Sequence, residues 1–569
     1  MAGEAPKSVR MRDVIRWAAP ILGPDSAFFT LAIVYGIGIS LLSLATPISV
    51  QMLINSVANT ALAAPLFTLS GILFALLMLS ALLSAFRVHL MEVFRQRIFA
   101  QLVAEITLRA VHSRNPFFSD DRKGDLFNRY FEVMNLQKSV PSLLIGLFTI
   151  LLQSAVGFVV TSFYHPFFLG FNLLFILIAW GIWRIWSRGA MTSAVTLSHA
   201  KYDTAHWLES VGASNGFYKS GRHIDYAIDK SEAMTARYIA AYRRHFNYSF
   251  SQNVAYLVLY AVASAGLLAL GGWLVIQGQL SIGQLVAAEL ILSSIFYGVA
   301  QLGPYLDVFY DLVTAVEELG LLYDIPQELP GRVTEPHDAA GDLAFASVQI
   351  DDVTINCTIP YRARLVAAAD PDTQRAFALL LKRHRTPEKG FVTLGGADIN
   401  ALDPYRLRSD VIVLDRPTIV ECSIRDYLEL CSPDDEPSSM MNALKLVGID
   451  RRIGKLPLGL DTVLASTGWP LSLPEMMRLK LAGALLSRPK ILVMSPLFDM
   501  VPADELSRLF DALGTLPTTV IYFTNRNNPP RLDGHLWLGR DRQWIENDRA
   551  IFNALRHADK LEEANANAR

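Results

Sequence analysis

The chain has 569 residues, of which 52% are hydrophobic and 18% are charged, and its mean hydropathy is +0.30. A chain of this length holds several domains, and this composition is too apolar for a protein that is soluble throughout. The formal net charge of −2 gives no indication of nucleic acid as a partner. The three cysteines, Cys357, Cys422 and Cys431, lack the spacing of a metal site or a disulfide framework, so we expect no metal ion and a reduced, cytosolic C-terminal part.

Apolar runs of membrane-spanning length fill the first half of the chain. The six predicted spans are residues 27–50, 64–86, 140–163, 166–187, 252–276 and 284–306. Short links without Lys or Arg alternate with two long links, 87–139 and 188–251, which are helical in pattern and rich in both signs of charge. By the positive-inside rule, the N-terminus, the long links and the C-terminal part are expected in the cytoplasm.

Three groups of residues in the links indicate a particular architecture. They are Asn115–Phe118 with Gly124–Arg129, His206–Ser210 with Phe217–Gly221, and Gln279–Leu285. Each alone is also typical of an ordinary amphipathic helical loop. Their order and spacing together resemble the two intracellular loops and the entry to the sixth span of a type I ABC exporter half, in the style of type I secretion exporters. The residues that this resemblance places in coupling loops are Gly124, Asp125, Arg129 and Glu209.

One carboxylate lies inside a predicted span. Glu289 is about one turn inside the sixth run, and a charge there is costly unless it faces water or a partner. It could line a cavity as a contact for substrate or protons, or it could reach the outer lipid headgroups. The residues do not decide between these interpretations.

Beyond the spans the chain becomes polar and then alternates short apolar strands with helices, as an α/β domain does. We therefore expect a transmembrane domain over residues 1–323, a linker rich in Pro and Gly over 324–342, and an α/β domain over 343–556. The tail, 557–569, is expected to be helical or frayed and has no assigned role.

The α/β domain resembles the nucleotide-binding domain of ABC transporters, with its phosphate-binding loop altered. Such a loop needs glycines whose N–H groups wrap phosphates, a Lys, and a Ser or Thr hydroxyl for Mg²⁺. Here the strand Arg364–Ala368 leads into Ala369-Asp370-Pro371-Asp372-Thr373-Gln374-Arg375, which has no glycine. The resemblance puts Gln374 at the Lys position and Arg375 at the hydroxyl position. Asp370 and Asp372 are expected to satisfy the helix N-terminus in place of a phosphate.

The other ATP-site motifs of the family are altered in the same way, while their scaffold is retained. Asp415 stands where the family has the Gln of the Q-loop, and Asn525 stands where it has the switch His. The signature LSGGQ has become Leu471–Glu475, ahead of a helix expected at Arg478–Leu486. The strand Ile491–Met494 ends in a Ser-Pro pair where the family has Asp-Glu. The altered positions in these last two motifs are Ser472, Pro474, Ser495 and Pro496.

The predicted fold class is multidomain α and α/β: a six-helix transmembrane exporter domain followed by a P-loop-NTPase-like ABC domain that lacks functional motifs. The resemblance implies a multi-pass protein of the bacterial inner membrane, in contact with lipid, and no nucleic-acid partner. ATP and Mg²⁺ binding are expected to be lost or weak, so we predict a pseudo-ATPase. Family members act as dimers, and we expect a homodimer or, preferentially, a heterodimer with an ATP-competent ABC half.

Three functions remain open. The first is a subunit that exports a peptide, protein or other hydrophobic cargo, driven by its partner's ATP and joined by a periplasmic adaptor. The second is a non-transporting membrane scaffold or regulator of a transporter or secretion assembly. The third is an atypical ATP-driven exporter that uses unfamiliar residues.

Overall fold

The apolar runs of the first half form long helices. The computed structural model describes residues 8–60, 64–114, 124–328, 341–432, 437–514 and 516–567, and the chain divides into two compact units, Met1–Gln327 and Glu328–Arg569. The segment Asn115–Phe118 and most of the expected linker 324–342 lie outside the described residues, as do the side chains of Gly124 and Asp125.

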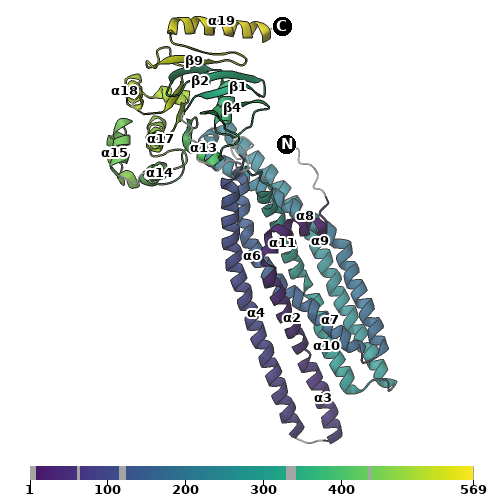
Figure 1. Cartoon of the computed structure of the whole chain (residues 1–569). Coiled ribbons are helices and arrows are strands. Elements are labelled where there is room, and N and C mark those ends of the chain that lie inside the picture. The colour runs from purple at the N-terminus through teal and green to yellow at the C-terminus, as the bar shows by residue number, and fades with distance from the viewer. Residues whose placement is uncertain are drawn as a thin grey trace. The chain divides into compact units, whose positions relative to one another are not determined.

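The first unit is helical (Figure 1). Its helices are α1 (Met11–Leu22), α2 (Ser26–Leu42), α3 (Ala45–Thr60), α4 (Ala64–Val111), α6 (Glu132–Ser142), α7 (Phe148–Ser162), α8 (Pro166–Ala213), α9 (Gly221–Ile276), α10 (Ile282–Ala300) and α11 (Leu302–Tyr323), with a 3-10 segment η2 (Gly124–Phe131) before α6. Among the described residues, six helical stretches are long and apolar enough to cross a membrane, as the sequence predicts. The long links are continuations of these helices: α4, α8 and α9 each extend well past the predicted span.

The sixth predicted span, 284–306, is not one uninterrupted helix. Its first part is α10, which begins with a capping box in which Ser281 and Gln284 bond each other's backbone N–H groups. The helix ends at Ala300, and Gln301 separates it from α11. Pro304 lies in the first turn of α11, where the missing N–H of a proline is tolerated. In a continuous helix, Pro304 could not donate the hydrogen bond that would extend the pattern of α10.

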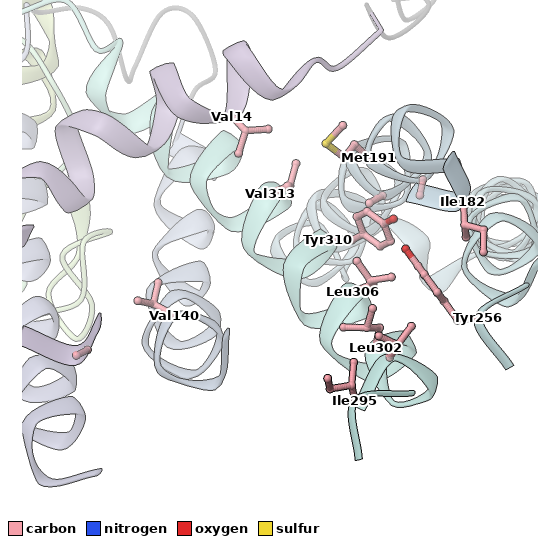
Figure 2. Packing of buried hydrophobic residues seen from close by; sticks show 14 of the residues in the cluster. Val14, Val140, Ile182, Met191, Tyr256, Ile295, Leu302, Leu306, Tyr310 and Val313 are labelled. Atoms are coloured by element: carbon pink, nitrogen blue, oxygen red, sulfur yellow. The ribbon is translucent and has the colours of Figure 1, made fainter. Parts of the chain in front are cut away.

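Buried side chains from α1, α2, α4 and α6 to α11 form one helical core. Figure 2 shows Tyr256 and Tyr310 near Leu306, and Val14 of α1 beside Val313 of α11. The Tyr310 hydroxyl donates to Gln252 Oε1 at 2.6 Å, so this buried polar group is satisfied.

The second unit contains two sheets. The antiparallel sheet has the order β2-β1-β4-β5, with β1 (Leu343–Ile350), β2 (Val353–Ile359), β4 (Lys389–Leu394) and β5 (Ala397–Asp398). The larger sheet has the order β10-β9-β3-β8-β7-β6, with β3 (Arg364–Ala369), β6 (Val411–Leu414), β7 (Ile491–Met494), β8 (Thr519–Phe523), β9 (Gly534–Leu538) and β10 (Gln543–Glu546). Its strands run parallel from β9 to β6, and β10 is antiparallel to β9. β7 and β8 are buried along their whole length, as continuous apolar strands of a parallel sheet are.

Helices accompany this sheet. They are α12 (Pro371–Leu381), α13 (Pro404–Asp410), α14 (Ile424–Cys431), α15 (Pro437–Leu446), α16 (Asp450–Gly454), α17 (Leu473–Ser487), α18 (Ala503–Leu513) and α19 (Arg549–Asn567). The expected tail 557–569 therefore continues α19 as far as Asn567. Asp559 holds this helix on the sheet, because its Oδ2 accepts a hydrogen bond of 2.7 Å from Nε1 of the buried Trp537.

Candidate functional site

The parallel sheet brings four of the altered motifs to one edge. The strands β3, β8, β7 and β6 are consecutive neighbours, so their carboxyl ends lie at the same edge. Asp370 directly follows β3, Ser495 follows β7 and Asp415 follows β6, while Asn525 is the second residue after β8. In open α/β sheets this is the edge where ligands bind.

The connection between β3 and α12 is a single residue. The strand ends at Ala369 and the helix begins at Pro371, which leaves only Asp370, with extended backbone angles (φ −75°, ψ 154°). A phosphate-binding loop of the P-loop type has several residues between its first glycine and its Lys, so that successive N–H groups can surround the phosphates. A one-residue connection has no such curve, and Pro371 removes another N–H. The connection therefore lacks the row of N–H groups that such a loop offers to phosphates.

The side chains around this connection differ partly from expectation. Asp370 is at the N-cap of α12, but no capping hydrogen bond from its carboxylate is found, so its expected role at the helix N-terminus stays a prediction. Proline at the first helical position already removes one of the free donors. Asp372 does lie in the first turn, where the helix dipole stabilises its negative charge. Its Oδ2 is 3.8 Å from Arg540 Nη2. Gln374 is half-buried and Arg375 is exposed.

Two buried hydroxyls lie at this edge, and the sequence reasoning overlooked one of them. Thr373, in the first turn of α12, is 0% exposed, and Ser495 is 4% exposed. Neither hydroxyl has a hydrogen-bond partner among the described residues. A hydroxyl enclosed in the core cannot serve as an open ligand for Mg²⁺, and a serine offers no carboxylate at the strand end.

Asp499 ties the turn after β7 to the end of β8. It lies in the 3-10 turn η6 (Pro496–Met500), and its carboxylate accepts hydrogen bonds from the Tyr522 hydroxyl (2.5 Å), the Thr524 hydroxyl (2.7 Å) and the Asn525 N–H (2.9 Å). Arg526 also donates to the backbone carbonyl of Asp499. We call these contacts of Asp499 with Tyr522, Thr524 and Asn525 the Asp499 clamp. They occupy the Asp499 carboxylate and the backbone N–H of Asn525. Sequence analysis missed it, because its members come from separate segments.

A group of basic side chains surrounds the loop after β6. Asp415 pairs with Lys382 at 3.1 Å. Lys480 of α17 donates to the carbonyls of Arg416 (2.7 Å) and Thr418 (3.0 Å). Burial lowers the pKa of Lys480 to about 8, with Asp415 opposing this effect and Lys382 and Arg416 adding to it. The position that resembles the Q-loop is thus held by the domain's own lysines.

The residues in place of LSGGQ form a helix cap. Ser472 and Glu475 make a reciprocal capping box, so α17 begins at Leu473 and not at Arg478, and Pro474 occupies its first turn. Arg452 Nε lies 3.1 Å from Glu475 Oε1, and Arg452 Nη2 donates to the backbone carbonyl of Pro470. Burial acts to raise the pKa of Glu475, but the hydrogen bonds from Ser472 and the charge of Arg452 outweigh it and lower that pKa. The Ser-x-x-Glu spacing was the sequence signal for this earlier start.

An exposed hydrogen bond joins the two predicted coupling loops, and buried polar contacts tie them to α11. Asn128 Nδ2 of η2 donates to Glu209 Oε1 of α8 at 2.5 Å. Arg129 forms an ion pair with Glu318 of α11, which also accepts from Ser198 at 2.7 Å. Glu318 is completely buried. Together with His199 and Glu317 it forms the group of potential metal ligands found among the described residues, but Arg129 already supplies its counter-charge.

Glu289 is half-buried in α10. Its Oε1 accepts from Ser293 at 2.8 Å, while its Oε2 is buried and has no partner among the described residues. Nearby on the same helix, Ser294 accepts from Gln153 of α7 at 3.2 Å. These contacts do not decide between a cavity contact and a headgroup contact, so the role of Glu289 stays a prediction.

Comparison with known proteins supports the resemblance. No family model matches the chain. The leukotoxin translocation ATP-binding protein LktB of Mannheimia haemolytica is 25% identical over 491 residues, which cover 84% of this chain and 69% of that protein. The alpha-hemolysin translocation ATP-binding protein HlyB of Escherichia coli is 25% identical over 492 residues with the same coverage.

A solved structure shows the same fold. The structure of a bacterial Atm1-family ABC exporter with ATP bound aligns with a TM-score of 0.80 at 16% identity, covering 94% of this chain and 96% of that one. The chain therefore has the ABC exporter fold, with six apolar helices followed by a C-terminal α/β domain. It is a multi-pass membrane protein, and its sequence relatives include translocation ATP-binding proteins for leukotoxin and alpha-hemolysin.

Proposed function

We propose that this chain is an ABC exporter subunit that does not hydrolyse ATP itself and that works beside an ATP-competent ABC half. The observation that carries the proposal is the one-residue connection between β3 and α12, where Asp370 and Pro371 replace a phosphate-wrapping loop. ATP and Mg²⁺ binding at this edge are accordingly weak or lost. Without bound phosphates there is nothing to position for transfer to water.

The neighbouring strand ends support this proposal. Hydrolysis needs a carboxylate for the metal and a group that polarises water. Ser495 and Pro496 provide neither, and the clamp commits the Asp499 carboxylate to three donors of β8 and its following loop. Asn525 contributes its backbone N–H to the same clamp. The domain is thus stabilised internally at the positions where an active relative would hold nucleotide.

The family arrangement explains why a partner is needed. In the resemblance, each ATP lies between the P-loop of one half and the signature of the other, so two copies of this chain would have no working site. The partner's own P-loop would face Leu473 and Pro474, and the Ser472–Glu475 capping box already occupies the helix N-terminus there. We propose that this subunit contributes helices to a translocation path whose access alternates with the partner's ATP cycle.

The relatives indicate the class of cargo and the setting. LktB and HlyB are named for the translocation of leukotoxin and alpha-hemolysin, so a peptide or protein is the favoured cargo, with a periplasmic adaptor as a further partner. We place the protein in a bacterial inner membrane, with its N-terminus, helical extensions and α/β domain in the cytoplasm. The excess of Lys and Arg in the long links supports this orientation.

Two measurements on the full-length protein in lipid nanodiscs test the proposal. The first is phosphate release from Mg-ATP, with binding of a fluorescent ATP analogue followed in parallel. We expect no turnover above that of empty nanodiscs and no saturable binding. Mg²⁺-dependent turnover that is lost in Gln374→Ala but kept in the exposed control Asp372→Ala would establish the atypical ATP-driven exporter and overturn the proposal.

The second measurement tests the partner. Co-expression with a competent ABC half should give a complex that survives purification and whose cargo export requires both chains. If the partner exports cargo without this chain, and adding this chain changes only the rate of export, the protein is a regulator or scaffold. If no complex forms, the proposed heteromeric export is wrong.

A further inference from the structure

We propose that the α/β unit holds a second ligand site, separate from the altered ATP-site edge, for a small amphiphilic anion. The site is a pocket of about 330 Å³ enclosed by α15, α17 and α18. Pockets that hold small molecules begin at about this size. It lies within a single structural unit, so its shape depends only on the packing of these helices.

The charges of the pocket favour an anion. Lys445 of α15, Arg478 of α17 and Arg508 of α18 contribute three positive charges, and Glu505 contributes one negative charge. Glu505 is already engaged, because its Oε2 lies 2.6 Å from Arg478 Nη2. Arg508 is paired as well, because its Nη2 lies 3.5 Å from Asp504 Oδ2 on the same helix, but both of these side chains are largely exposed and such a pair is weak. The side chains that line the pocket still carry a net positive charge from three separate helices. Converging cations on a concave surface raise the local concentration of anions.

Arg478 is the most enclosed of the three cations that line the pocket. Its side chain is largely buried, and its Nε–H has no acceptor among the described residues. A guanidinium donor left without an acceptor in the interior is costly. Carboxylates and phosphates match the planar fork of arginine, so the part of the guanidinium that lines the pocket favours such an anion.

The remaining surface is apolar, which indicates the second property of the ligand. Leu481 of α17 and Leu506 and Leu509 of α18 line the pocket together with Val501. An inorganic anion would leave this surface exposed to water, whereas an alkyl or aromatic group would cover it. The ligand class that satisfies both parts has an anionic head and a short apolar body.

A ligand here would contact two elements that also belong to the altered site. They are α17, which begins at the Ser472–Glu475 capping box, and Val501, which follows directly after the turn that contains the Asp499 clamp. Filling the pocket would hold α17, α18 and this turn together. The site could therefore stabilise the α/β unit without nucleotide.

Isothermal titration of the full-length protein in nanodiscs, with empty nanodiscs as the blank, tests the site. The probes are octanoate, octan-1-ol as the uncharged match, and inorganic phosphate as the anion without an apolar body. We expect saturable binding of octanoate, with the other two at least about tenfold weaker, since one charge-assisted contact is worth roughly that factor. Octanoate that binds no more tightly than octan-1-ol, or with no saturation, overturns the proposal.

The variants separate the site from general lipid partition. Lys445→Met with Arg508→Met removes rim charges and keeps the Arg478–Glu505 pair, so folding should be preserved and affinity should fall by about tenfold. Arg478→Met should abolish binding. Lys455→Met removes an exposed charge that does not line the pocket and should bind like the wild type. Equal affinity in all four proteins would show that octanoate does not use this pocket.

Discussion

The ion pair between Arg129 and Glu318 offers a sharp test of how the helical unit is held together. We predict that Arg129→Met strongly destabilises this unit. Glu318 is 0% exposed, and without Arg129 its nearest polar neighbours are the Ser198 hydroxyl at 2.7 Å and His199 at 4.0 Å. A single hydroxyl cannot compensate a desolvated carboxylate.

The size of the effect follows from burial. Removing one partner of a buried ion pair costs about 3–5 kcal/mol, because it leaves the other charge unpaired. In a unit of this size that corresponds to a fall in Tm of roughly 4–7 °C. Replacing both charges, in Arg129→Met with Glu318→Gln, should restore most of the loss, since a neutral amide can still bond Ser198.

Thermal unfolding of the detergent-solubilised protein, followed by size-exclusion chromatography of heated samples, measures these differences. The matched control is Arg95→Met, which breaks the exposed Glu92–Arg95 pair on α4 and should cost less than about 1 kcal/mol. The reasoning is refuted if Arg129→Met behaves like Arg95→Met. It is also refuted if the double variant is as unstable as the single one.

Three further predictions use the same unfolding assay. Glu475→Ala removes half of the capping box and should cost about 0.5–2 kcal/mol of stability. Glu475→Gln, which can still accept from the Ser472 N–H, should cost less. Equal losses in the two variants would show that the capping box does not stabilise α17. Burial beside Arg408 lowers the pKa of His384 to about 4, so the folded protein binds fewer protons at this residue than the unfolded chain does. The contribution of His384 to stability is therefore present above pH 6.5 and lost as pH falls towards 4. His384→Gln should therefore flatten the loss of Tm over that range, and an unchanged slope would refute this. Arg87 is 5% exposed and bonds Thr149 at 2.6 Å, and no ion pair of Arg87 is found among the described residues. Arg87→Met should keep or raise Tm, and a clear fall would show that the bond to Thr149 outweighs the buried charge.

Local patterns account for the parts of the fold that the sequence predicted well. The six apolar runs and the strand Ile491–Met494 depend on hydrophobicity along consecutive residues, which is visible in one dimension. The errors arose at element ends, where a few hydrogen bonds decide the boundary. The capping box moved the start of α17 to Leu473, and the break at Gln301 divided the sixth run.

The altered site was only partly predictable for a related reason. The sequence identified Asp370, Asp415, Ser495 and Asn525 by their place in motifs, and the sheet brings their strands together. It could not show that Asp499 binds Tyr522 and its neighbours, because that contact depends on β7 and β8 pairing in one register.

The sequence by itself determined the architecture of this protein: which segments are apolar enough to span a membrane, which form an α/β unit, and which residue types a nucleotide site would lack. These properties reside in composition and spacing. The tertiary structure alone decided how the altered positions are held, through the one-residue turn at Asp370 and the Asp499 clamp. It also decided which buried partners surround Glu318 in the helical unit. Such contacts join residues far apart in the chain, and their free energy depends on burial that exists only after folding.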